Sequence, residues 1–172
     1  MAKASSNDPA PRASDLVSQI KARVGDTLPA TIYRDRVRTQ RTRSYRLNAP
    51  ARATPIEILH TLLGVELRIG SRRISCPDRA TARYLSVFAR LGVGEVAIPY
   101  DITVISRLAD DLESGWFQIL ALIEHLTRDR PPQFRSRVRL QIVEEQRQEI
   151  GDAGAGPAIP EFIQNTRQRP RR

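Results

Sequence analysis

The spacing of apolar residues along this chain changes repeatedly, which predicts a domain that mixes strands with helices. Between residues 65 and 76, apolar side chains occupy alternate positions on both sides of the pair Gly70-Ser71. A period of two is typical of a strand with one buried face, and Gly-Ser suits a two-residue type II′ turn. The segment 65–76 is therefore predicted to form a β-hairpin, in which Arg68 lies opposite Arg73.

A helix and a third strand are predicted directly after the hairpin. Apolar residues of segment 79–91 recur at helical spacing behind Asp78, whose carboxylate can cap the helix, and Gly92 ends the pattern. Residues 95–99 have the composition of a short strand. The order strand, helix, strand is typical of a crossover connection, so the strand 95–99 is expected to join the hairpin in one small three-stranded sheet.

Two longer helices are predicted in the C-terminal half. The first, 102–128, begins after Asp101 and carries an apolar residue at every seventh position, with further apolar residues on the turns between. Pro131-Pro132 ends it, and a weaker amphipathic pattern over 134–150 predicts a helix that folds back as a helical hairpin. At about 1.5 Å per residue, the first helix is longer than a three-stranded sheet can cover. Its overhanging part needs a partner, either the second helix or another subunit.

The segment that precedes the hairpin is predicted to be helical. Thr54, Pro55 and Glu57 match a capping box with proline at the first helical position, apolar residues follow, and Gly64 supplies an end. The alternative is one long buried strand over 56–69, because short runs of leucine and β-branched residues occur in both kinds of element.

Little stable structure is predicted for the N-terminal third. Residues 14–24 have the spacing of an amphipathic helix that is too short to be stable alone, so it docks on the core or orders on a partner. Residues 31–47 permit a strand with Arg34, Arg36 and Arg38 on one face. Because the apolar set on the other face is thin, disorder is favoured for this segment.

These elements predict an α/β (α+β) fold in three parts. A globular core, 54–150, holds the small three-stranded sheet (the hairpin plus one crossover strand), the helices packed with it and the C-terminal helical hairpin. The flanking segments 1–53 and 151–172 are rich in arginine, proline and polar residues and are expected to be largely disordered basic arms.

Charge is segregated between these parts. Residues 1–55 carry a net charge of +7, residues 56–127 carry −2 and residues 128–172 carry +4. Seven arginines lie between positions 34 and 52, where Asp35 is the only acid. The excess of arginine over lysine is also what GC-rich coding produces, so only the clustering of the arginines is informative about function. Basic arms indicate a polyanionic partner, most simply nucleic acid, because each arginine that binds a phosphate releases a condensed counterion.

Nine arginines are predicted to contact nucleic acid, six from the N-terminal arm and three from the hairpin. They are Arg34, Arg36, Arg38, Arg41, Arg43, Arg46, Arg68, Arg72 and Arg73. Arginines directly opposite each other destabilise a strand pair, so a bound anion is one way to stabilise Arg68 and Arg73. The alternative is that a carboxylate such as Glu66 or Glu95 neutralises them or that water screens their charges. The alternative for the arginine run of the arm is that it only keeps the chain soluble.

The predicted function is non-catalytic association with nucleic acid, with DNA and RNA not distinguished. Tyr33 and Tyr45 add aromatic faces that can stack on unpaired bases. A second function class is a protein-interaction scaffold, in which the helix 102–128 forms a homo-oligomeric interface and the arginines bind an acidic protein surface. Nucleic acid that copurifies with the protein would favour the first class.

Few residues suggest catalysis, and neither an enzyme nor a cofactor is predicted. The lone Cys76 falls on the apolar face of the hairpin, so a buried structural thiol is expected, not a nucleophile paired with His60. Two histidines and the absence of a phosphate-binding loop motif argue against metal and nucleotide sites. The carboxylates that come nearest to a magnesium-binding set are Glu57, Glu66, Asp78 and Asp101. Two of them are already explained as helix caps.

The chain is expected to be cytoplasmic and to make no contact with membranes. It contains no run of 18 apolar residues, and residues 1–14 lack the apolar stretch of a secretory signal. A single cysteine also suits a reducing compartment. The alternative is that the N-terminus, which is poor in acids, is an organelle transit peptide.

Overall fold

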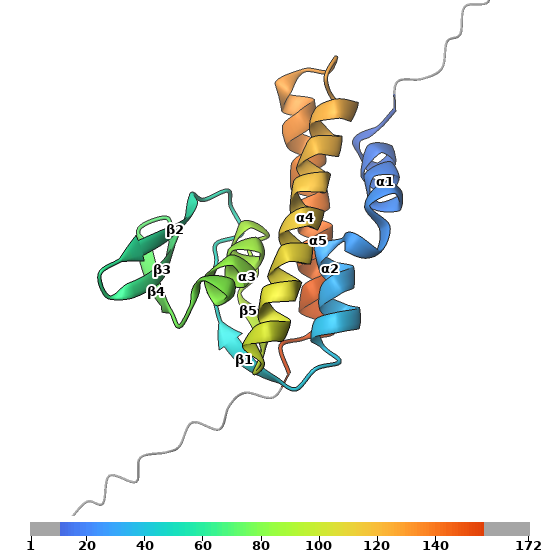
Figure 1. The fold of residues 1–172 in the computed structure, drawn as a ribbon. Helices are drawn as coiled ribbons and strands as arrows, with labels where there is room; N and C mark the ends of the chain where they lie inside the picture. The colour runs from blue at the N-terminus through green and yellow to red at the C-terminus, as the bar shows by residue number, and fades with distance from the viewer. Residues whose placement is uncertain (1–10, 157–172) are drawn as a thin grey trace, which may run out of the picture.

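Residues 11–156 are described by a computed structural model, in which a stack of helices is joined to two small antiparallel sheets (Figure 1). The predicted α+β class is confirmed, as is the helical hairpin at the end of the described residues. A three-stranded sheet is also present, but its strands are not the predicted set. The disorder predicted for residues 1–10 and 157–172 lies outside the described residues.

Two long helices, α4 (Ile102–Leu126) and α5 (Pro132–Ala153), form the C-terminal hairpin. The Asp101 carboxylate accepts a hydrogen bond from the Thr103 N–H at 2.8 Å, which confirms the predicted N-cap of α4. The apolar stripe of α4 is buried: Ile105, Leu108, Leu112, Trp116, Ile119 and Ile123. Helices α1 (Ala13–Val24), α3 (Arg79–Arg90) and α5 of the same chain pack against α4, so the overhang that was predicted to need a partner is covered within one molecule.

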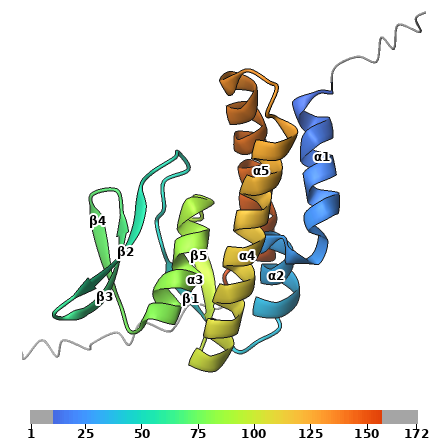
Figure 2. The same ribbon diagram turned by 45° about the horizontal axis from the view of Figure 1, so that its top comes forward.

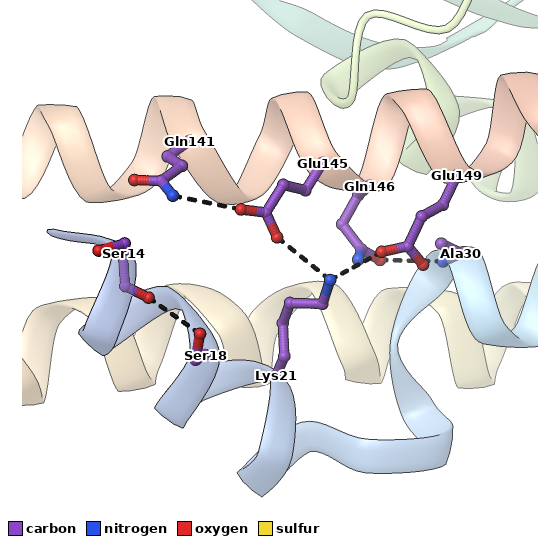
Figure 3. A network of polar contacts seen from close by, with 8 residues as sticks. All are labelled: Ser14, Ser18, Lys21, Ala30, Gln141, Glu145, Gln146 and Glu149. Atoms are coloured by element: carbon purple, nitrogen blue, oxygen red, sulfur yellow. Dashed lines mark hydrogen bonds and ion pairs between the residues drawn. The ribbon is translucent and has the colours of Figure 1, made fainter.

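Helix α1 (Ala13–Val24) lies along α4 and α5 on the other side from the sheets (Figure 2). Its residues Leu16, Ile20 and Val24 are buried in a second apolar cluster with side chains of α4 and α5. Lys21 donates to the carboxylates of Glu145 and Glu149 at 3.1 and 2.7 Å (Figure 3). The helix predicted over 14–24 is therefore present, and it docks on the core.

The chain stays helical after α1, where the sequence favoured disorder or a strand. Three short elements follow: η1 (Gly25–Thr27), α2 (Pro29–Ile32) and η2 (Tyr33–Val37). Ile32, Tyr33 and Val37 are each at most 1% exposed. The Ala30 N–H also donates to the buried amide of Gln146 at 3.0 Å (Figure 3). The few apolar residues of segment 28–37 are all buried, which is enough to hold it on the core. The prediction of disorder is therefore wrong for this segment.

The strand 95–99, β5 (Glu95–Pro99), pairs with β1 (Thr42–Arg46) and not with the hairpin. The pairing is antiparallel, with Thr42 opposite Pro99 and Arg46 opposite Glu95. Main-chain groups of Ala97 bind two buried tyrosines, because its N–H donates to the Tyr33 hydroxyl at 2.9 Å and its carbonyl accepts from Tyr84 at 2.6 Å. The predicted crossover is therefore replaced by a two-stranded ribbon that the N-terminal segment completes.

The three-stranded sheet has the order β2-β3-β4, from the segments β2 (Ile56–Thr61), β3 (Gly64–Ile69) and β4 (Arg72–Cys76). The predicted hairpin and its register are confirmed, with Arg68 opposite Arg73. The prediction of a helix before the hairpin is wrong, because the residues that follow Thr54 and Pro55 form strand β2. Backbone pairing of Ile56–Thr61 with β3 outweighs the local helix signal, and the exposed Leu62 and Leu63 form the turn.

Helix α3 (Arg79–Arg90) lies between the three-stranded sheet and α4 and packs against both. The Asp78 carboxylate accepts from the Thr81 N–H at 2.7 Å, as the sequence predicted. Tyr84 and Phe88 are fully buried at the centre of the larger core cluster, with ring centroids 5.0 Å apart. This cluster also includes Tyr33, so the core extends well beyond the predicted boundary at residue 54. Within residues 11–156, no helix has both the length and the apolar composition that crossing a membrane requires.

Candidate nucleic-acid interface

Two of the nine predicted arginines, Arg34 and Arg36, project from η2 and are bound by acids of the chain. The Arg34 guanidinium contacts the Asp35 carboxylate at 2.7 Å, next to it in sequence. Arg36 contacts the carboxylate of Asp111 on α4 at 2.6 Å. Both pairs are exposed, so each contributes little to stability, but the carboxylates compete with any phosphate for these arginines.

The opposed hairpin arginines are also neutralised within the sheet. Arg68 contacts Glu57 on β2 at 3.3 Å, and Arg73 lies 3.6 Å from Glu66 on β3. Carboxylates from neighbouring strands therefore resolve the like-charge conflict, which was the alternative to a bound anion. Arg68 and Arg73 consequently make a weaker case for a phosphate site than the sequence suggested.

Arg38 has a structural contact instead of a free guanidinium. Its Nε donates to the carbonyl oxygen of Ala153 at 3.0 Å, and a terminal nitrogen lies 3.4 Å from the hydroxyl of Thr42. The side chain thereby ties the end of α5 to the segment that enters β1.

The remaining four predicted arginines have no carboxylate partner among residues 11–156. They are Arg41, Arg43 and Arg46, in or next to β1, and Arg72 on β4. Arg46 is exposed and lies across the strand pair from Glu95. The guanidinium carbons of Arg41 and Arg43 lie 5.3 and 6.0 Å from the ring centroid of Tyr100, a distance at which a cation and an aromatic face attract each other.

Tyr45 connects this cluster to the hairpin. Arg43 and Tyr45 share one face of β1, because they are two residues apart in a strand. Burial raises the pKa of Tyr45 and the nearby Cys76 thiol raises it further, whereas the positive charges of Arg72 and Arg43 lower it. Arg72 and Arg43 therefore both lie within electrostatic reach of the Tyr45 hydroxyl. Arg72 also reaches the carbonyl oxygen of Asn48, at 3.5 Å.

We call this surface the Arg/Tyr patch. It consists of Arg41, Arg43, Tyr45, Arg72 and Tyr100. One hydrogen-bond donor of the patch is unsatisfied: the Nε of Arg43 is buried and makes no hydrogen bond to any described residue. Buried donors in folded proteins are almost always satisfied, so water or a ligand is expected to accept from it.

The aromatic residues of the patch differ from those predicted. Tyr33 is fully buried, and its hydroxyl donates to the Gly154 carbonyl at 2.8 Å, so it cannot stack on a base. Tyr100 is 57% exposed and takes that place, although sequence reasoning assigned it no binding role. Its position beside Arg41 follows from the β1–β5 pairing, in which the Tyr100 N–H donates to the Arg41 carbonyl at 3.3 Å.

The residues considered for catalysis have structural explanations. Glu57 and Glu66 pair with arginines, and Asp78 and Asp101 cap helices. Within residues 11–156, no group of three or more His, Cys, Asp or Glu side chains is placed to hold a metal ion. Cys76 is buried and its pKa is raised, chiefly by that burial. His60 and Cys76 both lie opposite Val65, on either side of β3, which separates them by about 10 Å in the sheet. That separation excludes a direct hydrogen bond between them, and the expectation of a structural thiol agrees with the geometry.

Comparison of the chain with protein-family models, with curated protein sequences and with solved structures gives no match.

Proposed function

We propose that this protein binds nucleic acid through the Arg/Tyr patch, with preference for unpaired strands. The observation that carries the proposal is that arginines with no carboxylate partner among residues 11–156 gather around two tyrosines, one of them exposed. Elsewhere on η2 and the hairpin, the predicted arginines are bound by acids. DNA and RNA are both candidates, and a cytoplasmic location is part of the proposal.

The chemistry of binding follows from the two kinds of side chain. Guanidinium groups of Arg41, Arg43 and Arg72 would contact successive phosphates, and the ring of Tyr100 would stack on a base that is not paired. Duplexes offer phosphates but no accessible base faces, so they would use only the first contact. Binding to single strands is therefore expected to be the tighter of the two.

A charge-matched pair of variants tests the assignment. Arg41→Gln/Arg72→Gln removes two charges from the patch, and Arg34→Gln/Arg36→Gln removes two charges that are already paired with acids. Binding to single- and double-stranded DNA and RNA would be measured on filters at several salt concentrations. We expect the slope of log K against log salt to flatten by about 1.4 units on single strands for the patch variant, and by clearly less for the control.

Tyr100→Leu tests the stacking contact without any change of charge. We expect it to weaken single-strand binding by about 1–3 kcal/mol, with little effect on duplex binding and on the salt slope. Equal losses in the patch variant and the control would show that binding depends on net charge alone. No binding of any nucleic acid at low salt would refute the proposal.

A further inference from the structure

A separate pocket of about 390 Å³ lies on the surface formed by α3, α4, α5 and the segment before β2. Its wall combines two arginines, Arg90 and Arg139, with the apolar side chains of Trp116, Leu140 and Val143. The volume lies within the range of sites for small molecules, which are mostly apolar with a few polar groups that fix orientation. None of these residues belongs to the Arg/Tyr patch.

Among residues 11–156, no aspartate or glutamate lines this pocket. Arg90 donates to the Ser86 hydroxyl at 2.9 Å and makes no ion pair with a carboxylate of residues 11–156. Burial lowers the pKa of Arg90, and the more distant Glu113, which Arg83 already binds at 3.0 Å, offsets this only in part. A half-buried guanidinium in this setting gains from an anion that replaces the water it has lost.

The second arginine of the pocket, Arg139, comes from α5. The guanidinium carbon of Arg139 lies 5.8 Å from the ring centroid of Trp116, and no carboxylate of the described chain pairs with it. Arg90 comes from α3 and Arg139 from α5, so the two cations face one cavity from different helices. Like charges that share a cavity favour occupation by an anion, because it lowers their mutual repulsion.

The apolar part of the pocket is equally specific. Trp116 lines the pocket but is only 2% exposed, so the apolar surface comes mainly from Leu140, which is 63% exposed although α5 buries its neighbours Val138 and Ile142. Covering the exposed leucine side chain would remove apolar surface from water, which favours binding of a ligand with an apolar body. An anion without an apolar body would leave this part of the wall uncovered.

We propose that the pocket binds a small organic anion, a carboxylate or phosphate monoester whose apolar body lies against Leu140 and Val143, next to Trp116. The anionic group is held between Arg90 and Arg139. This site is independent of the nucleic-acid interface.

The single tryptophan of the chain makes the proposal directly measurable. Because Trp116 lines the pocket and is the chain's one tryptophan, a change in tryptophan fluorescence reports binding at this site. Octanoate and octyl phosphate supply the two head groups on one body, octanol supplies the body without charge, and acetate supplies charge without the body. At constant ionic strength, we expect saturable changes with octanoate, octyl phosphate or both, and at least about tenfold weaker responses to octanol and acetate.

Matched variants assign the arginines. Arg139→Gln is expected to weaken binding of the anion about tenfold or more, because it removes a charge-assisted hydrogen bond. Arg137→Gln removes the same charge two residues away on the same helix, at an exposed position that does not line the pocket, and should leave binding within about twofold. Arg90→Gln is expected to weaken anion binding in the same way. If Arg90→Gln folds poorly, the comparison of Arg139→Gln with Arg137→Gln is sufficient to test the proposal.

The proposal is refuted if neither anion gives a saturable response below about 10 mM, which corresponds to less than about 3 kcal/mol of binding. It is also refuted if octanol binds as tightly as octanoate. The third contrary result is an equal loss of octanoate affinity in Arg137→Gln and Arg139→Gln. The patch variant Arg41→Gln/Arg72→Gln should bind octanoate normally. A loss of nucleic-acid binding can therefore be distinguished from a loss of anion binding at the pocket.

Discussion

Replacing Gly115 with alanine should weaken the packing of the N-terminal segment against the core. Gly115 is buried in the middle of α4, where the chain around η1 crosses it. A Cβ atom at this position would lie 1.9 Å from the carbonyl oxygen of Thr27 and 3.0 Å from its carbonyl carbon. Both obstacles are main-chain atoms, so no side-chain rotation relieves the overlap.

The magnitude follows from two opposed effects. Alanine is favoured over glycine inside a helix by about 1 kcal/mol. Against this, the η1 segment must move away from α4 by more than 1 Å to restore ordinary contact, which loosens the cluster of Val24 and Leu28 with Ile119 and Ile123. Overpacking of a well-packed core costs about 1–3 kcal/mol, and the upper end applies because backbone must move. We expect a net loss of about 2 kcal/mol.

Urea unfolding, followed by circular dichroism, would measure this loss. Gly151→Ala is the matched control, because Gly151 lies in α5 and a Cβ there meets nothing within 4 Å. That variant should be as stable as the wild type or more stable, by up to about 1 kcal/mol. Wild-type or greater stability in Gly115→Ala would refute the close approach of Thr27 to α4, and with it the docking of the N-terminal segment.

Three further predictions follow from the same structure. Trypsin should cut after Arg34 or Arg36 no faster than after Arg83, because η2 is packed on the core; rapid release of a fragment that begins at Val37 would contradict this. Ellman's reagent should modify Cys76 at least about tenfold more slowly at pH 8 in the folded protein than in urea, since burial raises the pKa of the thiol and blocks access to it. Glu149 and Glu145 raise the pKa of Lys21 above 10.5, so the wild type should exceed Lys21→Gln in stability, by up to about 1 kcal/mol, below pH 10.5. That advantage should fall as the pH rises through the higher folded pKa, and a difference that is constant to pH 12 would contradict the assignment.

The elements that the sequence predicted correctly depend on neighbours a few residues apart. The 65–76 hairpin follows from alternation around Gly70-Ser71, and the N-caps of α3 and α4 from an aspartate one position before each helix. In these cases the interacting groups are close in the chain, so their geometry follows from local backbone preferences. The buried position of Cys76 followed from the same alternation.

Elements whose partners are distant in sequence were decided by the tertiary structure. The local pattern from Thr54 to Glu57 favours a helix, but pairing with β3 makes the segment a strand. Nothing near residue 95 indicates that β5 pairs with β1, some fifty positions earlier, through contacts that the buried Tyr33 completes. The N-terminal segment looked too polar to fold, yet its few apolar side chains all reach the core.

The candidate site shows the same division. The positions of the arginines in the sequence identified the basic region, because the charge of a segment does not depend on how the chain folds. Which arginines remain available was decided by folding: Asp111, 75 residues away, binds Arg36, whereas β1–β5 pairing places Tyr100 beside Arg41 and Arg43. An ion pair needs two groups within about 4 Å, and for groups this far apart in the chain only the packed structure determines that distance.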